Sequence, residues 1–215
     1  MGDGSLGDGV WLYASVDRQA LILTRESEAG QRELRYVPVA NLAQDAGGAI
    51  HFERCAWDAG LPLALWEDPD VVTDGEKSQW LADWHSESAW LMAVHRSKYS
   101  NGLIGLTEQL LDAPPSTIPP DDLGRDRLRT DLLIFANDHW NFNVRGFNPG
   151  GNHGSLLRAS THSVLMMAGG GTGLPEGLSI AAPYDSLSFV PTILALMGRA
   201  EADLPGPLIE EIWRK

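Results

Sequence analysis

Asp131-Leu-Leu-Ile-Phe-Ala136 is a continuous apolar run, and Ser163-Val-Leu-Met-Met-Ala168 is a second one. A strand with apolar side chains on both faces is typical of a parallel sheet whose two faces are covered by helices. A helix is predicted over Ser186–Gly198, with Pro191 in its first turns and Gly198 as its C-cap. These segments predict an α/β fold that includes the C-terminal part of a mostly parallel sheet with flanking helices.

The sequence before these runs has a different pattern of apolar and polar residues. Residues 10–55 alternate between apolar and polar side chains, which predicts a small antiparallel β-meander. The expected strands are Val10–Ser15, Gln19–Thr24, Glu33–Val39 and Ile50–Arg54.

A long helix is predicted over residues 76–95, because apolar side chains recur there at helical spacing. The residues that share its apolar face are Trp80, Trp84, Leu91 and Val94. Asp74 is the expected N-cap, and a shorter helix is expected over Leu103–Leu111.

A proline-rich segment separates the two parts of the chain. Ala113-Pro-Pro-Ser-Thr-Ile-Pro-Pro-Asp-Asp cannot continue a helix or a central strand, because proline lacks the backbone N–H that both structures need. We therefore expect a β-meander and helix subdomain over residues 1–112, a linker over 113–130 and an α/β part over 131–215.

Composition and charge exclude several classes of protein. The chain of 215 residues has 16 basic and 29 acidic side chains, a net charge of −13, and no basic stripe that would neutralise the phosphates of a nucleic-acid duplex. No apolar run is long enough to span a membrane. The first nine residues lack the features of a signal peptide, so a soluble protein is expected. A single cysteine, Cys55, excludes an internal disulfide.

The segment most informative about chemistry is Asn148-Pro-Gly-Gly-Asn-His153-Gly-Ser155, a glycine-rich loop between the two apolar runs. Loops at strand ends hold the ligands of α/β sheets, and flanking glycines let the backbone approach a metal ion or an anion closely. Neutral imidazole is a good zinc ligand. From spacing alone, the alternative that the glycines only form a turn stays open.

The order of the C-terminal motifs resembles the alkaline phosphatase superfamily, and within it the type I phosphodiesterases and nucleotide pyrophosphatases. The resemblance rests on the G-x-H-G loop at His153, on the apolar run that ends at Gly169-Gly-Gly171, and on Phe189-Val-Pro-Thr-Ile-Leu-Ala-Leu-Met-Gly198. The closing Leu204-Pro-Gly-Pro-Leu-Ile-Glu-Glu-Ile212 resembles the family's tail. The similarity covers roughly residues 130–212.

This resemblance implies that His153 is a ligand of one of two catalytic Zn²⁺ ions in an enzyme that hydrolyses phosphate mono- or diesters, with a small phosphate ester or a nucleotide as substrate. The family's Asp-His-Gly triplet and its Thr or Ser nucleophile motif are not found in this sequence. Thr117 lies in the linker and has no strand before it. The chain is therefore expected to be the C-terminal part of a larger enzyme, incomplete on its own, with residues 1–130 as a cap-like insert.

Two alternatives remain. Asp138, His139, His153 and His162 could form a self-contained zinc site, since carboxylate and imidazole groups suit zinc. The family, however, has a Gly-aromatic pair at His139 and an apolar residue at His162. The expected metal ligands are His153 and, second to it, His162. The other alternative is a binding module that kept the fold without the chemistry.

The remaining candidates are weaker. Arg145 and Arg158 flank the histidine loop and could contact a phosphate, although a surface ion pair is the more common use of such residues. The histidines at positions 51, 85 and 95 and the tryptophans of the predicted helix are interpreted as structural. A sheet that lacks half of its covering helices is expected to leave apolar surface exposed and to cause self-association.

Overall fold

The computed structural model describes residues 9–57, 60–112, 132–136, 155–169, 173–201, 203–204 and 206–214. The chain divides into two compact units, an N-terminal unit (Met1–His162) and a C-terminal unit (Ser163–Lys215), and each is described by itself. The predicted linker, 113–130, lies outside the described residues.

The N-terminal unit is built on an antiparallel meander, as the alternation of its sequence predicts. The strands follow one another in the order β1-β2-β3-β4, and the short β5 pairs with the first residues of β3, so the fold is mixed α/β with an antiparallel sheet. The strands are β1 (Gly9–Ser15), β2 (Arg18–Glu26), β3 (Arg32–Gln44), β4 (Ile50–Arg54) and β5 (His85–Ser86).

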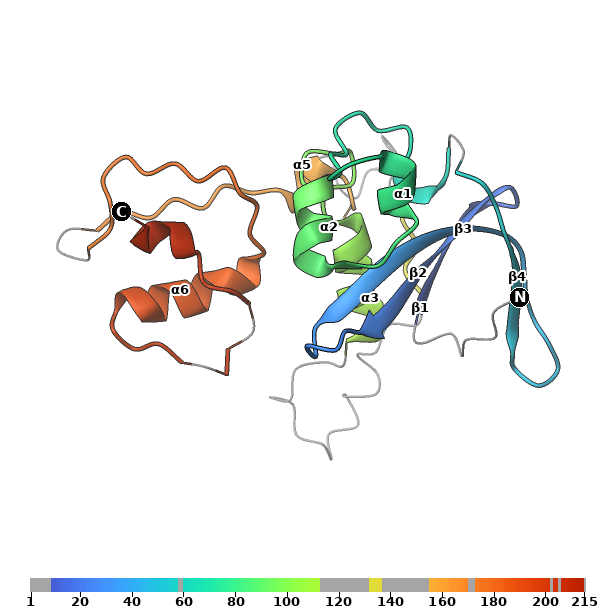
Figure 1. Ribbon diagram of the computed structural model, residues 1–215, viewed down its shortest axis with the longest axis horizontal. Coiled ribbons are helices and arrows are strands. Elements are labelled where there is room, and N and C mark those ends of the chain that lie inside the picture. Colours follow the sequence, from blue (N-terminus) through green and yellow to red (C-terminus); the bar gives the residue numbers. More distant parts are fainter. Residues whose placement is uncertain are drawn as a thin grey trace, which may run out of the picture. The chain divides into compact units, whose positions relative to one another are not determined.

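Short helices cover one face of this sheet (Figure 1). They are η1 (Pro62–Ala64), α1 (Lys77–Leu81), α2 (Glu87–Val94) and α3 (Gly102–Leu111). The exposed α5 (Arg158–Thr161) is hydrogen-bonded to the connection between α2 and α3 instead. Because successive side chains of a strand point to opposite faces, the even-numbered residues of β1, of β2 and of the first part of β3 face the helices that cover the sheet. The strand residues of this core are Val10, Leu12, Ala20, Ile22, Leu34 and Tyr36.

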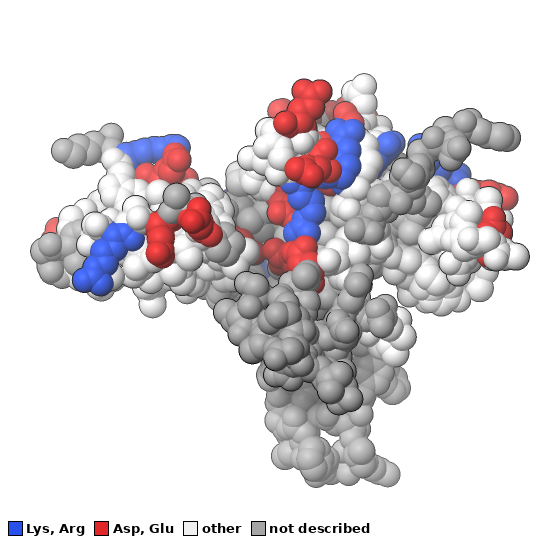
Figure 2. Space-filling model, turned by 90° about the horizontal axis from the view of Figure 1, so that it is seen from below, with Lys and Arg blue, Asp and Glu red and all other residues white. Residues whose placement is uncertain are grey.

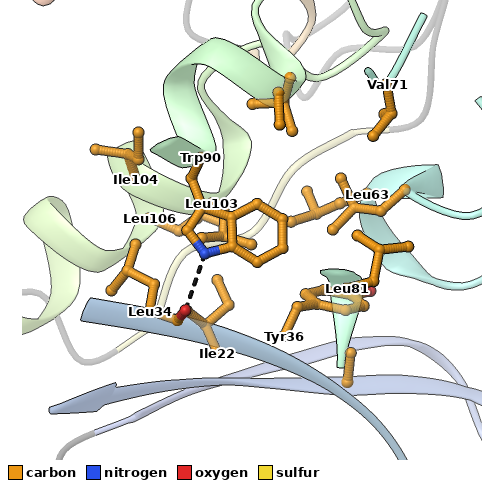
Figure 3. Close-up of a cluster of buried hydrophobic side chains, with 14 of the residues drawn as sticks. Ile22, Leu34, Tyr36, Leu63, Val71, Leu81, Trp90, Leu103, Ile104 and Leu106 are labelled. Atoms are coloured by element: carbon orange, nitrogen blue, oxygen red, sulfur yellow. Dashed lines mark hydrogen bonds between the residues drawn. The ribbon is translucent and has the colours of Figure 1, made fainter. Parts of the chain in front are cut away.

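The indole of Trp90 lies in the middle of the core, with none of its surface exposed (Figure 3). Its Nε1–H donates to the backbone carbonyl oxygen of Leu34 at 2.9 Å, which satisfies the one polar group of the ring. The ring of Trp80 meets it edge to face, with centroids 4.7 Å apart. Helix α2 is therefore held to β3 by a hydrogen bond as well as by packing.

The prediction of one continuous helix over residues 76–95 is wrong, because β5 separates α1 from α2. Ser86 ends β5 and then caps α2, since its Oγ accepts a hydrogen bond from the backbone N–H of Ala89 at 3.3 Å. Glu76, and not Asp74, caps α1. Apolar residues before and after β5 pack into the same core. Their spacing in the sequence stays helical across the break between α1 and α2.

The two apolar runs are not paired into a sheet among the described residues. Residues 132–136 and 162–169 have no assigned strand or helix, and a mostly parallel sheet is not shown. Several of their side chains are open to solvent, including Leu132 at 73% exposed and Met166 at 88%. The expected parallel sheet with an uncovered face therefore stays a prediction.

The C-terminal unit contains η2 (Ser186–Ser188), α6 (Phe189–Leu196) and η3 (Glu210–Trp213). The helix predicted in this region is confirmed, with Gly198 at a φ of 68° just beyond its end. The hydroxyl oxygen of the buried Thr192 on α6 accepts a hydrogen bond from the backbone N–H of Ile209 at 3.1 Å. The closing segment is therefore fastened to α6.

None of the helices in the described part of the chain is both long enough and apolar enough to cross a membrane.

Replacing Trp90 by alanine tests the centre of the core. We expect Trp90→Ala to lower the free energy of unfolding by about 3–5 kcal/mol, because it leaves a cavity and an unpaired carbonyl group. Met92→Ala on the same helix is the matched control: its side chain is 51% exposed, and a loss under about 1 kcal/mol is expected. Urea unfolding followed by circular dichroism measures both, and equal losses would contradict this description of the core.

Two glycines of the C-terminal unit form a matched pair. Both have a positive φ, but a Cβ at Gly206 would lie 2.6 Å from the backbone of Leu187, whereas a Cβ at Gly177 would meet nothing within 4 Å. We expect Gly206→Ala to speed amide hydrogen exchange in α6 clearly more than Gly177→Ala, which adds only backbone strain. Equal exchange rates in the two variants would mean that the turn at Gly206 does not hold α6.

Candidate functional site

Three of the four histidine-loop candidates, Asp138, His139 and His153, lie outside the described residues, as does Arg145. The described chain resumes at Ser155, directly after the loop, and continues through α5 to His162. The structure therefore shows how the C-terminal side of the loop is anchored.

That anchor is the connection between α2 and α3. The backbone N–H of Arg158 donates to the carbonyl oxygen of Lys98 at 2.8 Å, and its guanidinium donates to the carbonyl oxygen of Arg96 at 2.9 Å. The hydroxyl groups of Ser100 and Thr161 lie 3.1 Å apart. One guanidinium nitrogen of Arg158 is thus used to fix α5, and the remaining N–H groups of this exposed side chain have no partner among the described residues.

His162 ends α5. Its backbone N–H donates to the carbonyl oxygen of Arg158 at 2.8 Å, and its side chain is exposed, with no hydrogen bond to a described residue. An imidazole in this position can bind a metal ion without breaking an existing contact. Among the described residues, no three His, Cys, Asp or Glu side chains are grouped so that they could hold a metal ion.

The other histidines have local partners, in agreement with their structural interpretation. The ring of His85 stacks on Trp80 with centroids 3.8 Å apart, and its Nε2 lies 2.7 Å from the carbonyl oxygen of the same residue. His95 contacts the carbonyl oxygen of Met92. His51 lies 2.9 Å from a carboxylate oxygen of Asp45 in the β3–β4 hairpin.

A hollow of about 360 Å³ lies beside α6 in the C-terminal unit. Its described lining residues are Pro191, Ala200, Glu201, Leu204, Gly206 and Leu208. The charge in this lining is the carboxylate of Glu201, which repels an anion, so the hollow does not suit a phosphate ester.

A tyrosine–carboxylate pair ties the same unit together. The hydroxyl group of Tyr184, just before η2, donates to a carboxylate oxygen of Glu211 on η3. Burial raises the pKa of Tyr184 to about 12, and the hydrogen bond to Glu211 adds to this rise. The same bond lowers the pKa of Glu211. Both shifts favour the state in which the tyrosine is protonated and the carboxylate is charged.

The face of the sheet on the side away from the helices was not predicted from the sequence, and we call it the open face. Before the register shift at Ala40–Ala43 in β3, it is made of the odd-numbered residues of β1 to β3, with the even-numbered residues of β4 beside them. Trp11 and Tyr13 are exposed on it, whereas Leu21, Val37 and Val39 are buried, with Leu23, Leu42 and Phe52 packed against them. The alternation of Leu34, Arg35 and Tyr36 is the signal that could have revealed it, since both neighbours of this arginine point into the core.

The charges on the rest of the surface are mixed. On the side of the molecule shown in Figure 2, basic side chains lie beside acidic ones and form no continuous basic field.

The Tyr184–Glu211 pair predicts a distinct alkaline titration. The folded pKa of Tyr184, about 12, lies above the ordinary value of 10. Its bond therefore stabilises the unit fully below pH 10, and this stabilisation is lost as the pH rises through 12. The ultraviolet absorbance of tyrosinate after a rapid pH jump should show a step near pH 12 that Tyr184→Phe removes and Glu211→Gln shifts downward. Tyr13→Phe is the control and must leave this step in place.

Comparison with family models, with curated protein sequences and with solved structures finds no match to this chain. The residues and their geometry are therefore the basis on which its function is inferred.

Proposed function

We propose that this chain is the C-terminal part of a metal-dependent hydrolase of phosphate mono- or diesters, in which His153 holds a catalytic Zn²⁺ ion. His162 is the second candidate ligand. The observation that carries the proposal is the order of motifs in the sequence: a G-x-H-G loop, an apolar run, and a helix with Pro191-Thr192 in its first turn and Gly198 just after its end.

The C-terminal unit supports this proposal. Helix α6 has Pro191 near its start and Gly198 just after its end, as the resemblance requires of that segment. A hydrogen bond to Thr192 joins the helix to the backbone at Ile209, so the segment that contains the Pro-Thr pair is linked to the closing tail. The helix with its Pro-Thr pair and the closing tail are thus in contact in the structure, in addition to resembling the family's motifs in sequence.

The exposed apolar runs support it as well. A strand with apolar side chains on both faces is stable only inside a covered sheet. Residues 132–136 and 163–168 have this pattern but no strand partner among the described residues. In the proposed enzyme they belong to a mostly parallel sheet whose other strands and covering helices come from the remainder of the protein.

The proposed chemistry gives each element a role. A zinc ion at this site would hold the phosphoryl oxygens and promote loss of the proton of the attacking hydroxyl group. In the proposed site, His153 would supply an imidazole nitrogen to the ion. Residues 155–162 fix the end of that loop to the α2–α3 connection. Arg158 lies on this anchor and has N–H groups available for an anionic oxygen.

Zinc titration by calorimetry tests the proposal on the whole chain. We expect weak binding by the wild-type chain, since one or two imidazoles are an incomplete zinc site. His153→Ala should lower the affinity at least about tenfold, in line with the loss of a direct ligand. His51→Ala, a histidine in the β3–β4 hairpin, is the control and should change nothing. Little or no release of nitrophenol from its phosphate mono- and diester is expected.

The other outcomes identify the alternatives. Tight one-to-one zinc binding that both His153→Ala and His162→Ala abolish, with robust ester hydrolysis, would favour a self-contained zinc site. No zinc binding by the wild-type chain would contradict the metal-site proposal and favour a binding module without catalysis.

A further inference from the structure

Two exposed aromatic rings lie together on the open face, on the first strand of the sheet. Trp11 is 51% exposed and Tyr13 is 57% exposed, and their rings meet edge to face with centroids 5.7 Å apart. They are two residues apart on β1, so both side chains point to the same side of the strand. Because β1 is the first strand in the order β1-β2-β3-β4, the pair lies at the margin of the open face.

Hydrogen bonds hold the indole of this pair in place. The Nε1–H of Trp11 donates to the side-chain oxygen of Gln19 at 3.2 Å, and the amide of Gln19 donates to the carbonyl oxygen of Val16 at 2.8 Å. Gln19 itself is only 6% exposed. The polar group of the indole is thus used within the chain, while half of the ring surface stays open. A ligand that suits the pair packs on the rings and does not need the indole N–H.

Proline meets these requirements better than a sugar does. Its ring is apolar and rigid, and proline-rich segments are bound at aromatic-lined sites in several kinds of protein module. Such segments adopt the polyproline II conformation before they bind, so little conformational entropy is lost. A sugar needs polar side chains beside the aromatic rings, and the amide next to Trp11 is already hydrogen-bonded to Trp11 and Val16. The aromatic pair therefore indicates a proline-rich ligand.

The chain has a segment of this class in its own sequence. Residues 113–120 are Ala-Pro-Pro-Ser-Thr-Ile-Pro-Pro, with one pair of prolines at 114–115 and a second pair at 119–120. They lie outside the described residues, but the residue before them, Asp112, does not. Asp112 directly follows α3, and its carboxylate accepts hydrogen bonds from the guanidinium group of Arg32, the first residue of β3. The start of the proline-rich segment is therefore fixed beside the sheet.

The strand register gives the distance from this starting point to the aromatic pair. Trp11 stands opposite Leu21, which stands opposite Val37, five residues along β3 from Arg32. With about 3.3 Å per residue and about 4.8 Å per strand, the backbones of Arg32 and Trp11 are roughly 19 Å apart.

The length of the segment decides which proline pair can span this distance. A polyproline II chain advances about 3.1 Å per residue. Pro115 is three residues from Asp112, which corresponds to about 9 Å in this conformation. Pro119 and Pro120 are seven and eight residues away, which corresponds to about 22–25 Å. The second proline pair can therefore reach the aromatic pair, and the first is too close to Asp112.

We propose that the Trp11–Tyr13 pair is the docking site of the chain's own second proline pair, Pro119-Pro120, in a polyproline II conformation. The short connection to Asp112 gives the segment an effective concentration on the order of mM at the site, so a weak contact is enough to occupy it. The predicted linker would then have a binding site on the N-terminal unit. This inference does not depend on the proposed hydrolase.

Hydroxyl-radical footprinting of the whole chain, read out by mass spectrometry, measures how open the two rings are. We expect the double variant Pro119→Ala, Pro120→Ala to increase the oxidation rates of Trp11 and Tyr13 about threefold, the ratio for a site that is occupied two-thirds of the time. Trp213 in the C-terminal unit, which is 45% exposed, is the internal reference and should keep its rate.

The matched control changes the first proline pair. The double variant Pro114→Ala, Pro115→Ala alters the same segment by the same chemistry, but this pair is too close to Asp112 to reach the site. It should leave the oxidation rate of Trp11 at the wild-type value.

A synthetic peptide of residues 112–122 gives a second measurement. It should bind the Pro119→Ala, Pro120→Ala variant more tightly than the wild-type chain, because the wild-type site is already occupied. Adding Trp11→Ala to that variant should weaken peptide binding about tenfold, as expected for the loss of an aromatic anchor. Circular dichroism verifies that each variant is folded.

Three results would overturn the proposal. The first is an oxidation rate of Trp11 that is the same in the wild-type chain and in the Pro119→Ala, Pro120→Ala variant. The second is an equal increase in both double variants, which would mean that the second pair has no specific contact. The third is a protection of Trp11 that disappears on dilution, which would make a second copy of the chain the source of the occupant.

Discussion

The hydrogen-bonded contact between Trp90 and β3 is the constraint on which the N-terminal unit depends. It joins α2 to the sheet at a carbonyl group, so the helix cannot slide without leaving a buried polar atom unpaired. Because the even-numbered residues of β1, of β2 and of the first part of β3 pack against the helices, the odd-numbered residues beside them must point the other way. The open face, with Trp11 and Arg35, is thus a consequence of how the core is built.

Sequence periodicity predicted the elements whose partners are near in the chain. The four strands of the meander and the helices α3 and α6 were predicted from alternation and spacing, because each of them buries one face locally. The break at β5 was missed, since two residues leave no periodic signal and the cap at Ser86 is a single hydrogen bond. The apolar runs at 132–136 and 163–168 predict burial, but a sheet also needs strand partners, and none lies among the described residues.

The histidine loop and the open face of the sheet also differ in how far the sequence predicts them. The glycine-rich loop at His153 was identified because a histidine flanked by glycines is an uncommon pattern that indicates a metal or anion site. The second apolar cluster of Leu21, Val37 and Val39 was not identified, since it depends on the pairing of β2 with β3 and on the β3–β4 hairpin whose Leu42 and Phe52 pack against it. Pairing between strands is not stated by a single sequence.

The central claim is that His153 binds zinc, and X-ray absorption spectroscopy at the zinc edge tests it most directly. For the zinc-loaded chain we predict nitrogen scattering at about 2.0–2.1 Å with the outer-shell pattern of imidazole, and a loss of that pattern in His153→Ala. A spectrum of oxygen and water ligands alone, or one that His153→Ala leaves unchanged, would contradict the account.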